Sequence, residues 1–184
     1  LEHDNLVVKA ARLLKEVTKC REGVQIELYK HIPWGMGLGG GSSDAATTLL
    51  ALNELWKLGQ TGSELGSLAS RLGSDVPFFI YKGTALVEGI GEKVTPLPSL
   101  PSTWFVLLVP PLAKIPGKTA RMYSELDNSH FTKGQFVNAA LQSLKQGEMF
   151  GASLMFNVFA EVAFHVFPKL GEYMKGMEEA GAPG

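Results

Sequence analysis

Apolar side chains recur at three- and four-residue spacing near the start of the chain, which predicts an amphipathic helix from Asn5 to about Lys19. Over residues 24–29 apolar and polar side chains alternate, and this period of two is typical of a half-buried strand. A glycine-rich loop comes next. The strongly apolar stretch behind it predicts a centrally packed helix that begins near Ser43. We therefore expect a helix, a strand, a loop and a second helix.

Weaker signals continue this pattern to residue 98. Thr61 stands three positions before Glu64, which is the spacing of a capping box and predicts a helix that runs to about Leu72. The apolar segments that follow predict short strands or turns over residues 76–81, 84–88 and 93–97. This part of the chain is accordingly expected to have an α+β fold.

Prolines interrupt the hydrophobic pattern between residues 96 and 101, and a continuous apolar run over residues 104–109 then predicts a new strand. We therefore expect two domains, residues 1–98 and 99–184. Pro168 predicts a helix break near Val166, and the phenylalanine-rich run 150–167 is interpreted as buried helix surface. Helices of the second domain are predicted over residues 118–126, 135–146, 150–164 and 167–179.

Composition and charge narrow the class of protein. The 184 residues are 45% apolar, which is enough for a packed core, and a formal net charge of −1 gives no basic excess for binding nucleic acid. The single cysteine, Cys20, excludes an internal disulfide and fits a reducing compartment, so a cytoplasmic protein is expected. No apolar run approaches the roughly 20 residues that span a bilayer, which argues against a membrane partner. The histidines have no metal-ligand spacing with one another or with Cys20, which argues against a zinc site.

The glycine-rich loop carries the strongest chemical signal. Five glycines lie between Gly35 and Gly41, directly before a pair of serines. Because glycine lacks a Cβ atom, such a loop can adopt positive φ angles and let backbone N–H groups approach an anion closely. The helix behind it adds the positive end of its dipole, which favours a polyphosphate ligand. The loop lacks the lysine of the common P-loop and the later acid of the dinucleotide fingerprint. A flexible linker is the alternative, but the flanking strand and helix favour binding.

The segment Pro33–Ala46 resembles the second motif of the GHMP small-molecule kinases. Its triple glycine followed by two serines and Asp44 is similar to the form found in members that phosphorylate 4-diphosphocytidyl-2-C-methyl-D-erythritol in non-mevalonate isoprenoid biosynthesis. The segments Glu2–Ala11 and Leu72–Phe79 agree with this resemblance. It implies a kinase that uses ATP and Mg²⁺, with an S5-like N-terminal and a ferredoxin-like C-terminal α+β domain. A homoserine- or mevalonate-type GHMP kinase, and a non-catalytic ligand-binding protein on the same fold, remain alternatives.

The two ends of the chain are interpreted as internal to a longer protein. The chain has no initiator Met, and it stops in a helix-ending turn at Ala180–Gly184. The resemblance implies a strand with a lysine motif before residue 1 and another glycine-rich motif after residue 184. The chain is therefore expected to be a fragment that is inactive alone, and its sequence does not indicate an oligomeric state.

The resemblance also implies roles for individual residues. Asp75 matches the catalytic aspartate, a general base for the substrate hydroxyl, although an Asp before an apolar run is by itself more often a turn or cap residue. Asn5 and Lys30 match positions that contact the nucleotide base, but they also suit a helix cap and a solvated lysine. Thr119 corresponds to a substrate-side threonine or simply to a helix N-terminus. The other nucleotide-binding candidates form the loop: Pro33, Trp34, Gly35, Met36, Gly37, Leu38, Gly39, Gly40, Gly41, Ser42 and Ser43.

The polar residues behind the glycines have more than one compatible use. Ser42 and Ser43 are expected to cap the helix, to offer oxygens to a phosphate or Mg²⁺, or to do both. Asp44 is expected to act electrostatically on the first helical turn rather than as a metal ligand. No residue is therefore assigned as a certain metal ligand.

Overall fold

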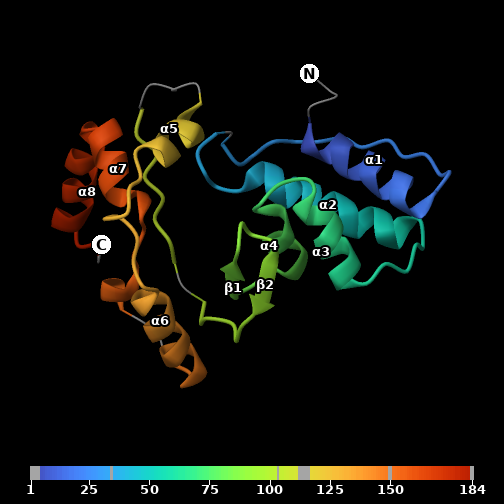
Figure 1. Ribbon diagram of the computed structural model, residues 1–184. Coiled ribbons are helices and arrows are strands. Elements are labelled where there is room, and N and C mark those ends of the chain that lie inside the picture. The colour runs from blue at the N-terminus through green and yellow to red at the C-terminus, as the bar shows by residue number, and fades with distance from the viewer. Residues whose placement is uncertain (1–4, 34, 103, 112–116, 149–150, 183–184) are drawn as a thin grey trace. The chain divides into compact units, whose positions relative to one another are not determined.

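The chain divides into two compact units, residues 1–99 and 100–184 (Figure 1). The computed structural model describes residues 5–33, 35–102, 104–111, 117–148 and 151–182, without the side chains of Lys118 and Thr119. Helices and a small sheet are both present, which confirms the α+β class. The interpretation of residues 1–98 and 99–184 as the two kinase domains stays a prediction.

In its described part the first unit consists of α1 (Leu6–Thr18), α2 (Gly40–Leu55), α3 (Gly62–Ser70), α4 (Val76–Tyr81), β1 (Ala85–Glu88) and β2 (Lys93–Pro96). The predicted first helix is confirmed. Asn5 is its N-cap, with Oδ1 accepting a hydrogen bond from the Val7 N–H at 3.0 Å. Lys19 ends it in the left-handed conformation, with φ +54°. The buried positions have the spacing of one helical face: Val7, Ala10, Ala11 and Leu14.

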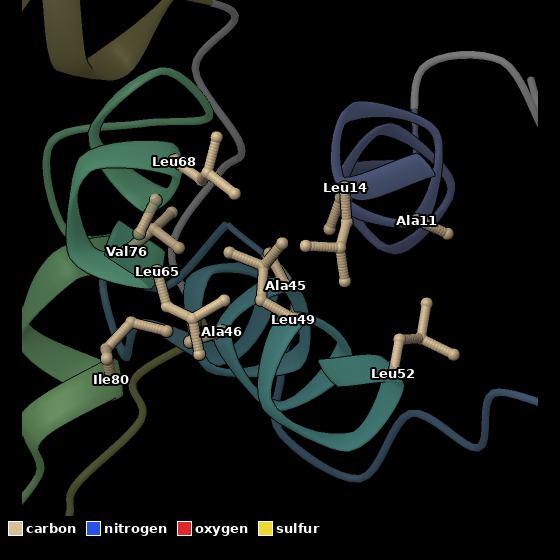
Figure 2. Close-up of a cluster of buried hydrophobic side chains, with 12 residues drawn as sticks. Ala11, Leu14, Ala45, Ala46, Leu49, Leu52, Leu65, Leu68, Val76 and Ile80 are labelled. Atoms are coloured by element: carbon tan, nitrogen blue, oxygen red, sulfur yellow. The ribbon is translucent and has the colours of Figure 1, made fainter. Parts of the chain in front are cut away.

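Helix α2 lies at the centre of the first unit's core, as predicted. Its buried side chains form one cluster with those of α1, α3 and α4, because α2 packs against each of these helices. In Figure 2 the Leu14 side chain extends from α1 toward Ala45 and Leu49 of α2. Helices α1 and α2 run side by side in the same direction, so the chain between them must return along their length (Figure 1). The starts of the two helices are thereby brought to the same end of the unit.

Helix α3 has the predicted capping box. The Glu64 N–H donates to Oγ1 of Thr61 at 3.2 Å, and the Thr61 N–H donates to Oε2 of Glu64 at 2.7 Å. Strands β1 and β2 were also predicted correctly. They form an antiparallel pair in which Val87 lies opposite Val94. The sequence signals for local turns and caps therefore hold in this part of the chain.

Residues 76–81 form helix α4, and the prediction of a strand or turn there was wrong. Pro77 lies in the first turn, where its fixed φ suits a helix and its missing N–H would have had no helical acceptor. Val76 and Ile80 are one turn apart and both are buried. A short apolar run does not by its periodicity distinguish a buried helix from a buried strand.

The predicted strand over residues 24–29 was also wrong. Residues 20–33, all of which the structure describes, contain no strand. Within the described ranges β1 and β2 pair only with each other, so this segment has no neighbouring strand to pair with. Its apolar side chains are accordingly exposed to solvent, and the exposed fraction is 40% for Val24 and 41% for Ile26. The path of this segment still carries Lys30 and Ile32 to the start of α2.

In its described part the second unit consists of α5 (Lys118–Ser124), α6 (Gln135–Lys145), the 3₁₀ turn η2 (Ala152–Leu154), α7 (Phe159–Val166) and α8 (Lys169–Glu179). The break predicted at Pro168 is confirmed, since α7 ends at Val166 and α8 begins at Lys169. Residues 104–109 form no strand, and Trp104 is 98% exposed. The prediction of one buried helix over residues 150–164 was also wrong, because its described part is interrupted and Phe156 is 48% exposed.

Across the described ranges, no helix combines the length and the apolar character that crossing a bilayer requires.

Candidate active site

Helix α2 begins earlier than predicted, inside the glycine run. Its first residue is Gly40 rather than a residue near Ser43, and its N-cap is Gly39, with φ +68°. The first helical hydrogen bond runs from the Ser43 N–H to the Gly39 carbonyl at 2.8 Å. No side chain caps this end within the described chain. The N–H groups of Gly40, Gly41 and Ser42 therefore have no acceptor inside the helix.

The loop before α2 depends on glycine at alternate positions. Gly35, Gly37 and Gly39 have φ angles of +75°, +77° and +68°, which is the left-handed region that an L side chain rarely adopts. Gly40 has another requirement. A Cβ atom there would lie 3.0 Å from Cγ2 of Ile32, so the segment before the loop closely approaches the first turn of α2. The expected positive φ angles are thus present.

Of the two uses expected for the serine pair, capping of α2 is absent from the described part of the structure. Both residues lie within the helix, and Oγ of Ser43 donates to the Gly40 carbonyl at 2.9 Å. The Ser42 hydroxyl makes no hydrogen bond to any described residue, and the residue is half-buried. Serine oxygens are thus present beside the free N–H groups, but they are not the helix cap.

Asp44 is not in the first turn of α2, so its predicted action on that turn was wrong as well. It is the fifth residue of the helix, and its Oδ2 makes an ion pair with Nζ of Lys30. The two side chains are 27% and 43% exposed. This pair joins the irregular segment before the loop to α2. It also places a cation beside the one carboxylate that the motif contains, which offsets the repulsion that this carboxylate would exert on a bound anion.

Asn5 lies at the same end of the unit. Its side-chain oxygen is used to cap α1, and the neighbouring Leu6 side chain would lie 3.6 Å from a Cβ atom on Gly41. The start of α1 therefore packs beside the first turn of α2. Since the side-chain amide of Asn5 has donors besides the oxygen that caps α1, the cap and a ligand contact are chemically compatible.

Asp75 lies at the N-cap position of α4, in an exposed turn and without a side-chain capping bond. Phe79 follows four positions later, so Asp75 and Phe79 lie on the same face of the helix. The Phe79 ring packs over the loop, since a Cβ atom on Gly39 would lie 2.6 Å from its Cζ atom. The ring also makes an edge-on contact with Phe78, at a centroid distance of 5.2 Å. The packing of Phe79 thereby links α4, which begins directly after Asp75, to the loop before α2.

The remaining predicted residues are placed less fully. Trp34 lies outside the described residues, and Pro33 and Met36 are exposed loop residues. Thr119 belongs to the first turn of α5 in the second unit, so its backbone is part of a helix N-terminus. A pocket of the second unit is lined by Glu125, His130, Glu161, Val162 and His165, and none of the predicted site residues with a described side chain lies among them.

Sequence reasoning did not single out Phe79 and Ile32 as packing partners of the glycines. The only available signal was their position beside the motifs, in the Val-Pro-Phe-Phe run and directly before Pro33. What these elements can do chemically is hold an anion at the free backbone N–H groups of α2 and expose the carboxylate of Asp75 at the start of α4.

The chain is similar to known proteins over nearly all of its length. Residues 5–83 match the family model described as the GHMP kinases N-terminal domain. The chain is 47% identical over 178 residues, or 97% of its length, to a 4-diphosphocytidyl-2-C-methyl-D-erythritol kinase of Dehalococcoides mccartyi. It is 41% identical over 179 residues, again 97% of its length, to the kinase of that name from Geobacillus kaustophilus.

A solved structure gives the same result. The crystal structure of a 4-(cytidine 5'-diphospho)-2C-methyl-D-erythritol kinase superposes with a TM-score of 0.72 at 36% sequence identity, and the match covers 96% of this chain and 62% of that one. The chain likewise spans 62% of the Dehalococcoides relative and 60% of the Geobacillus relative. The similarity thus extends over nearly all of these residues, in both sequence and fold, and residues 5–83 belong to the GHMP kinase N-terminal domain family.

Proposed function

We propose that this chain supplies the phosphate-binding loop and the general base of an ATP-dependent kinase that phosphorylates a hydroxyl of 4-diphosphocytidyl-2-C-methyl-D-erythritol. The observation that carries the proposal is the uncapped N-terminus of α2. The packing of Phe79 on Gly39 joins this end of α2 to α4, at the start of which Asp75 has an exposed carboxylate. The substrate is inferred from the name of the related kinases. On this proposal the reaction belongs to non-mevalonate isoprenoid biosynthesis, in the cytoplasm.

The ATP phosphates would bind at the start of α2. The free N–H groups of Gly40, Gly41 and Ser42 can donate to phosphate oxygens, and the helix dipole adds a partial positive charge at the same place. The alternating left-handed glycines keep side chains away from the path of the polyphosphate. Lys30 and Asn5 would lie toward the base of the nucleotide, since both are near this end of α2.

Mg²⁺ would reach the site with the nucleotide. Magnesium in kinase sites is usually held by substrate phosphates, water and one or two side-chain oxygens rather than by an all-protein cage. The described residues include no group of three His, Cys, Asp or Glu side chains that could hold a metal ion. Asp44 is already paired with Lys30. We therefore assign no protein ligand to the metal and no catalytic step to it.

Asp75 would act on the attacking hydroxyl. Its carboxylate accepts the proton of the substrate hydroxyl, while the hydroxyl oxygen forms a bond to the γ-phosphorus of ATP. The bond between that phosphorus and the β,γ-bridging oxygen breaks, and ADP leaves with the electron pair. Because Asp75 is exposed and its carboxylate is not used as a cap, it is free to make this contact. The products are ADP and a phosphate monoester.

The second unit would belong to the same kinase. On this proposal residues 1–98 are the ATP-binding domain and residues 99–184 the second kinase domain, with Thr119 on the substrate side. A homoserine- or mevalonate-type kinase would use the same loop and base, and a non-catalytic binding protein would use the loop alone. The first alternative differs from the proposal in the acceptor that is phosphorylated, and the second differs in having no turnover.

We expect Asp75→Asn to separate catalysis from binding in the full-length protein that contains this chain. The amide keeps the shape of the side chain but is a far weaker proton acceptor, so kcat should fall by roughly 10²–10⁴-fold with ATP affinity nearly unchanged. Asp127→Asn is the matched control, since Asp127 is an exposed aspartate of the second unit that bonds to Ser129. Steady-state turnover and ATP calorimetry on both variants provide the measurement. A folded Asp75→Asn protein with the kcat of the control would refute the assignment.

A further inference from the structure

The turn between β1 and β2 makes an unusually close backbone approach to the residue before Asp75. Gly91 has φ +111°, and a Cβ atom there would lie 2.0 Å from the carbonyl oxygen and 2.8 Å from the carbonyl carbon of Ser74. The atoms concerned are backbone, which cannot rotate aside as the end of a side chain can. An ordinary contact to a Cβ atom begins near 3.4 Å. Only glycine therefore fits at position 91 without moving Ser74.

Local bonds hold the β1–β2 turn in shape. The Gly91 N–H donates to the Glu88 carbonyl at 3.2 Å, and the Ile90 N–H donates to Oε2 of Glu92 at 2.7 Å. Lys93 and Glu88 close the base of the turn with an ion pair at 3.2 Å. The surface that the turn presents to Ser74 is thus set by three bonds within residues 88–93.

The side chain of Asp75 does not itself fix the turn that carries it. Asp75 is exposed, and its carboxylate makes no capping bond to the described part of α4. No bond of this side chain to the described residues therefore fixes the turn from which α4 begins. The bond from the Val76 N–H to the Gly73 carbonyl, at 3.2 Å, closes that turn on one side. The Ser74 carbonyl lies within the same turn, and it is the group against which Gly91 packs.

We propose that Gly91 is a positioning residue for Asp75: the β1–β2 turn holds the Ser74 carbonyl and thereby sets where the Asp75 carboxylate lies. The inference rests on the proposed function, since it assigns Gly91 a role in turnover that acts through the catalytic base. A Cβ atom at position 91 must displace Ser74 by about 1 Å or more, and a misplacement of that size can lower turnover by about 10²-fold. Phe79, which packs on the loop at the phosphate-binding start of α2, lies farther along α4 than the turn that contains Ser74, so ATP affinity should not change.

The test compares Gly91→Ala with Gly83→Ala in the full-length protein. Gly83 also has a left-handed φ, +68°, but a Cβ atom there would meet nothing within 4 Å. Both variants therefore carry backbone strain, and only one displaces Ser74. We expect kcat to fall by about 10²-fold in Gly91→Ala alone, with the ATP dissociation constant unchanged in both. Equal kcat in the two variants would overturn the proposal.

A double variant shows whether the effect passes through Asp75. If it does, Gly91→Ala should reduce kcat little further in an Asp75→Asn background, because the misplaced base is already absent. Multiplicative losses would mean that Gly91 acts elsewhere and would overturn the proposal. If Asp75→Asn alone keeps its kcat, the proposed function and this inference both fail. If Asp75→Asn loses kcat and Gly91→Ala does not, only the inference fails.

Should Gly91→Ala not fold, Glu92→Ala tests the same turn more mildly. It removes the carboxylate that accepts from the Ile90 N–H and adds no atom near Ser74. We then expect a smaller fall in kcat with an unchanged ATP dissociation constant, and an unchanged kcat would overturn the proposal.

Discussion

At the scale of single residues, the glycines of the loop differ in what a side chain would disturb. Gly39 is the N-cap of α2 and has a left-handed φ, and its Cα faces the Phe79 ring. A methyl group there both strains the backbone and pushes the ring that links the loop to α4. Gly35 and Gly37 have similar φ angles, but a Cβ atom on either would meet nothing within 4 Å.

We predict that Gly39→Ala weakens ATP binding by more than about tenfold, because the free N–H groups at the start of α2 lose their arrangement. Gly59→Ala is the matched control. Its φ of +67° gives the same strain, no atom lies within 4 Å of the added carbon, and it is outside the loop. Calorimetric titration of ATP into both folded variants provides the comparison. Equal dissociation constants would remove the loop from the nucleotide site.

The site was partly predictable at this scale. Glycine's freedom made the loop and its positive φ angles foreseeable from the sequence, and the resemblance pointed to Asp75. The ion pair of Lys30 with Asp44 was not foreseeable, because its partners are 14 positions apart and meet only through the path of an irregular segment. The same is true of Phe79 on Gly39, since α4 was expected to be a strand or turn.

At the scale of elements, helix α2 carries the core that supports the site. Leu49 of α2 is fully buried in the cluster that this helix forms with α1, α3 and α4. Leu55, at the end of the same helix, is 63% exposed. The phosphate-binding N–H groups belong to this helix, so packing of its buried face fixes where they lie.

We predict that Leu49→Ala lowers the free energy of unfolding by about 2–5 kcal/mol, because it leaves a cavity in the central cluster. Leu55→Ala should change it by no more than about 0.5 kcal/mol. Denaturant unfolding of the full-length protein, monitored by circular dichroism, measures the change in the free energy of unfolding for both variants. Similar losses in the two variants would mean that α2 is not packed as described.

The capping box of α3 gives a pH dependence. The Thr61 N–H, and then its hydroxyl, hold the pKa of the Glu64 carboxyl below its usual value. A lowered pKa stabilises the folded state above the ordinary carboxyl pKa of about 4.3, and this contribution is lost as pH falls through the lowered value. We predict that Glu64→Gln flattens the fall in Tm between about pH 5 and pH 3. The same slope in the parent and the variant would contradict this, and Thr61→Ala should behave like Glu64→Gln.

The elements that the sequence predicted correctly are those with a local signal. Helix α1 has its periodicity, α3 its capping box, and the break before α8 its proline. Residues 24–29 and 104–109 have strand-like patterns, but a strand also needs a partner, and none of the described residues pairs with them. Pairing is a property of distant parts of a chain, so no local pattern could decide it.

At the scale of the whole molecule, family and fold are established more firmly than chemistry. The similarity to 4-diphosphocytidyl-2-C-methyl-D-erythritol kinases covers 97% of this chain but 62% of the Dehalococcoides relative. A fold of this kind also serves kinases of other acceptors, so the acceptor has to be measured.

The most direct measurement is coupled ADP release by the full-length protein, offered 4-diphosphocytidyl-2-C-methyl-D-erythritol, homoserine and mevalonate separately with ATP and Mg²⁺. We predict turnover with the diphosphocytidyl alcohol, and a value of kcat/KM for it far above that for the other two acceptors. Asp75→Asn should abolish most of that signal, which excludes a contaminating kinase. ADP release with homoserine or mevalonate alone, or with none of the three acceptors, would contradict the proposed function.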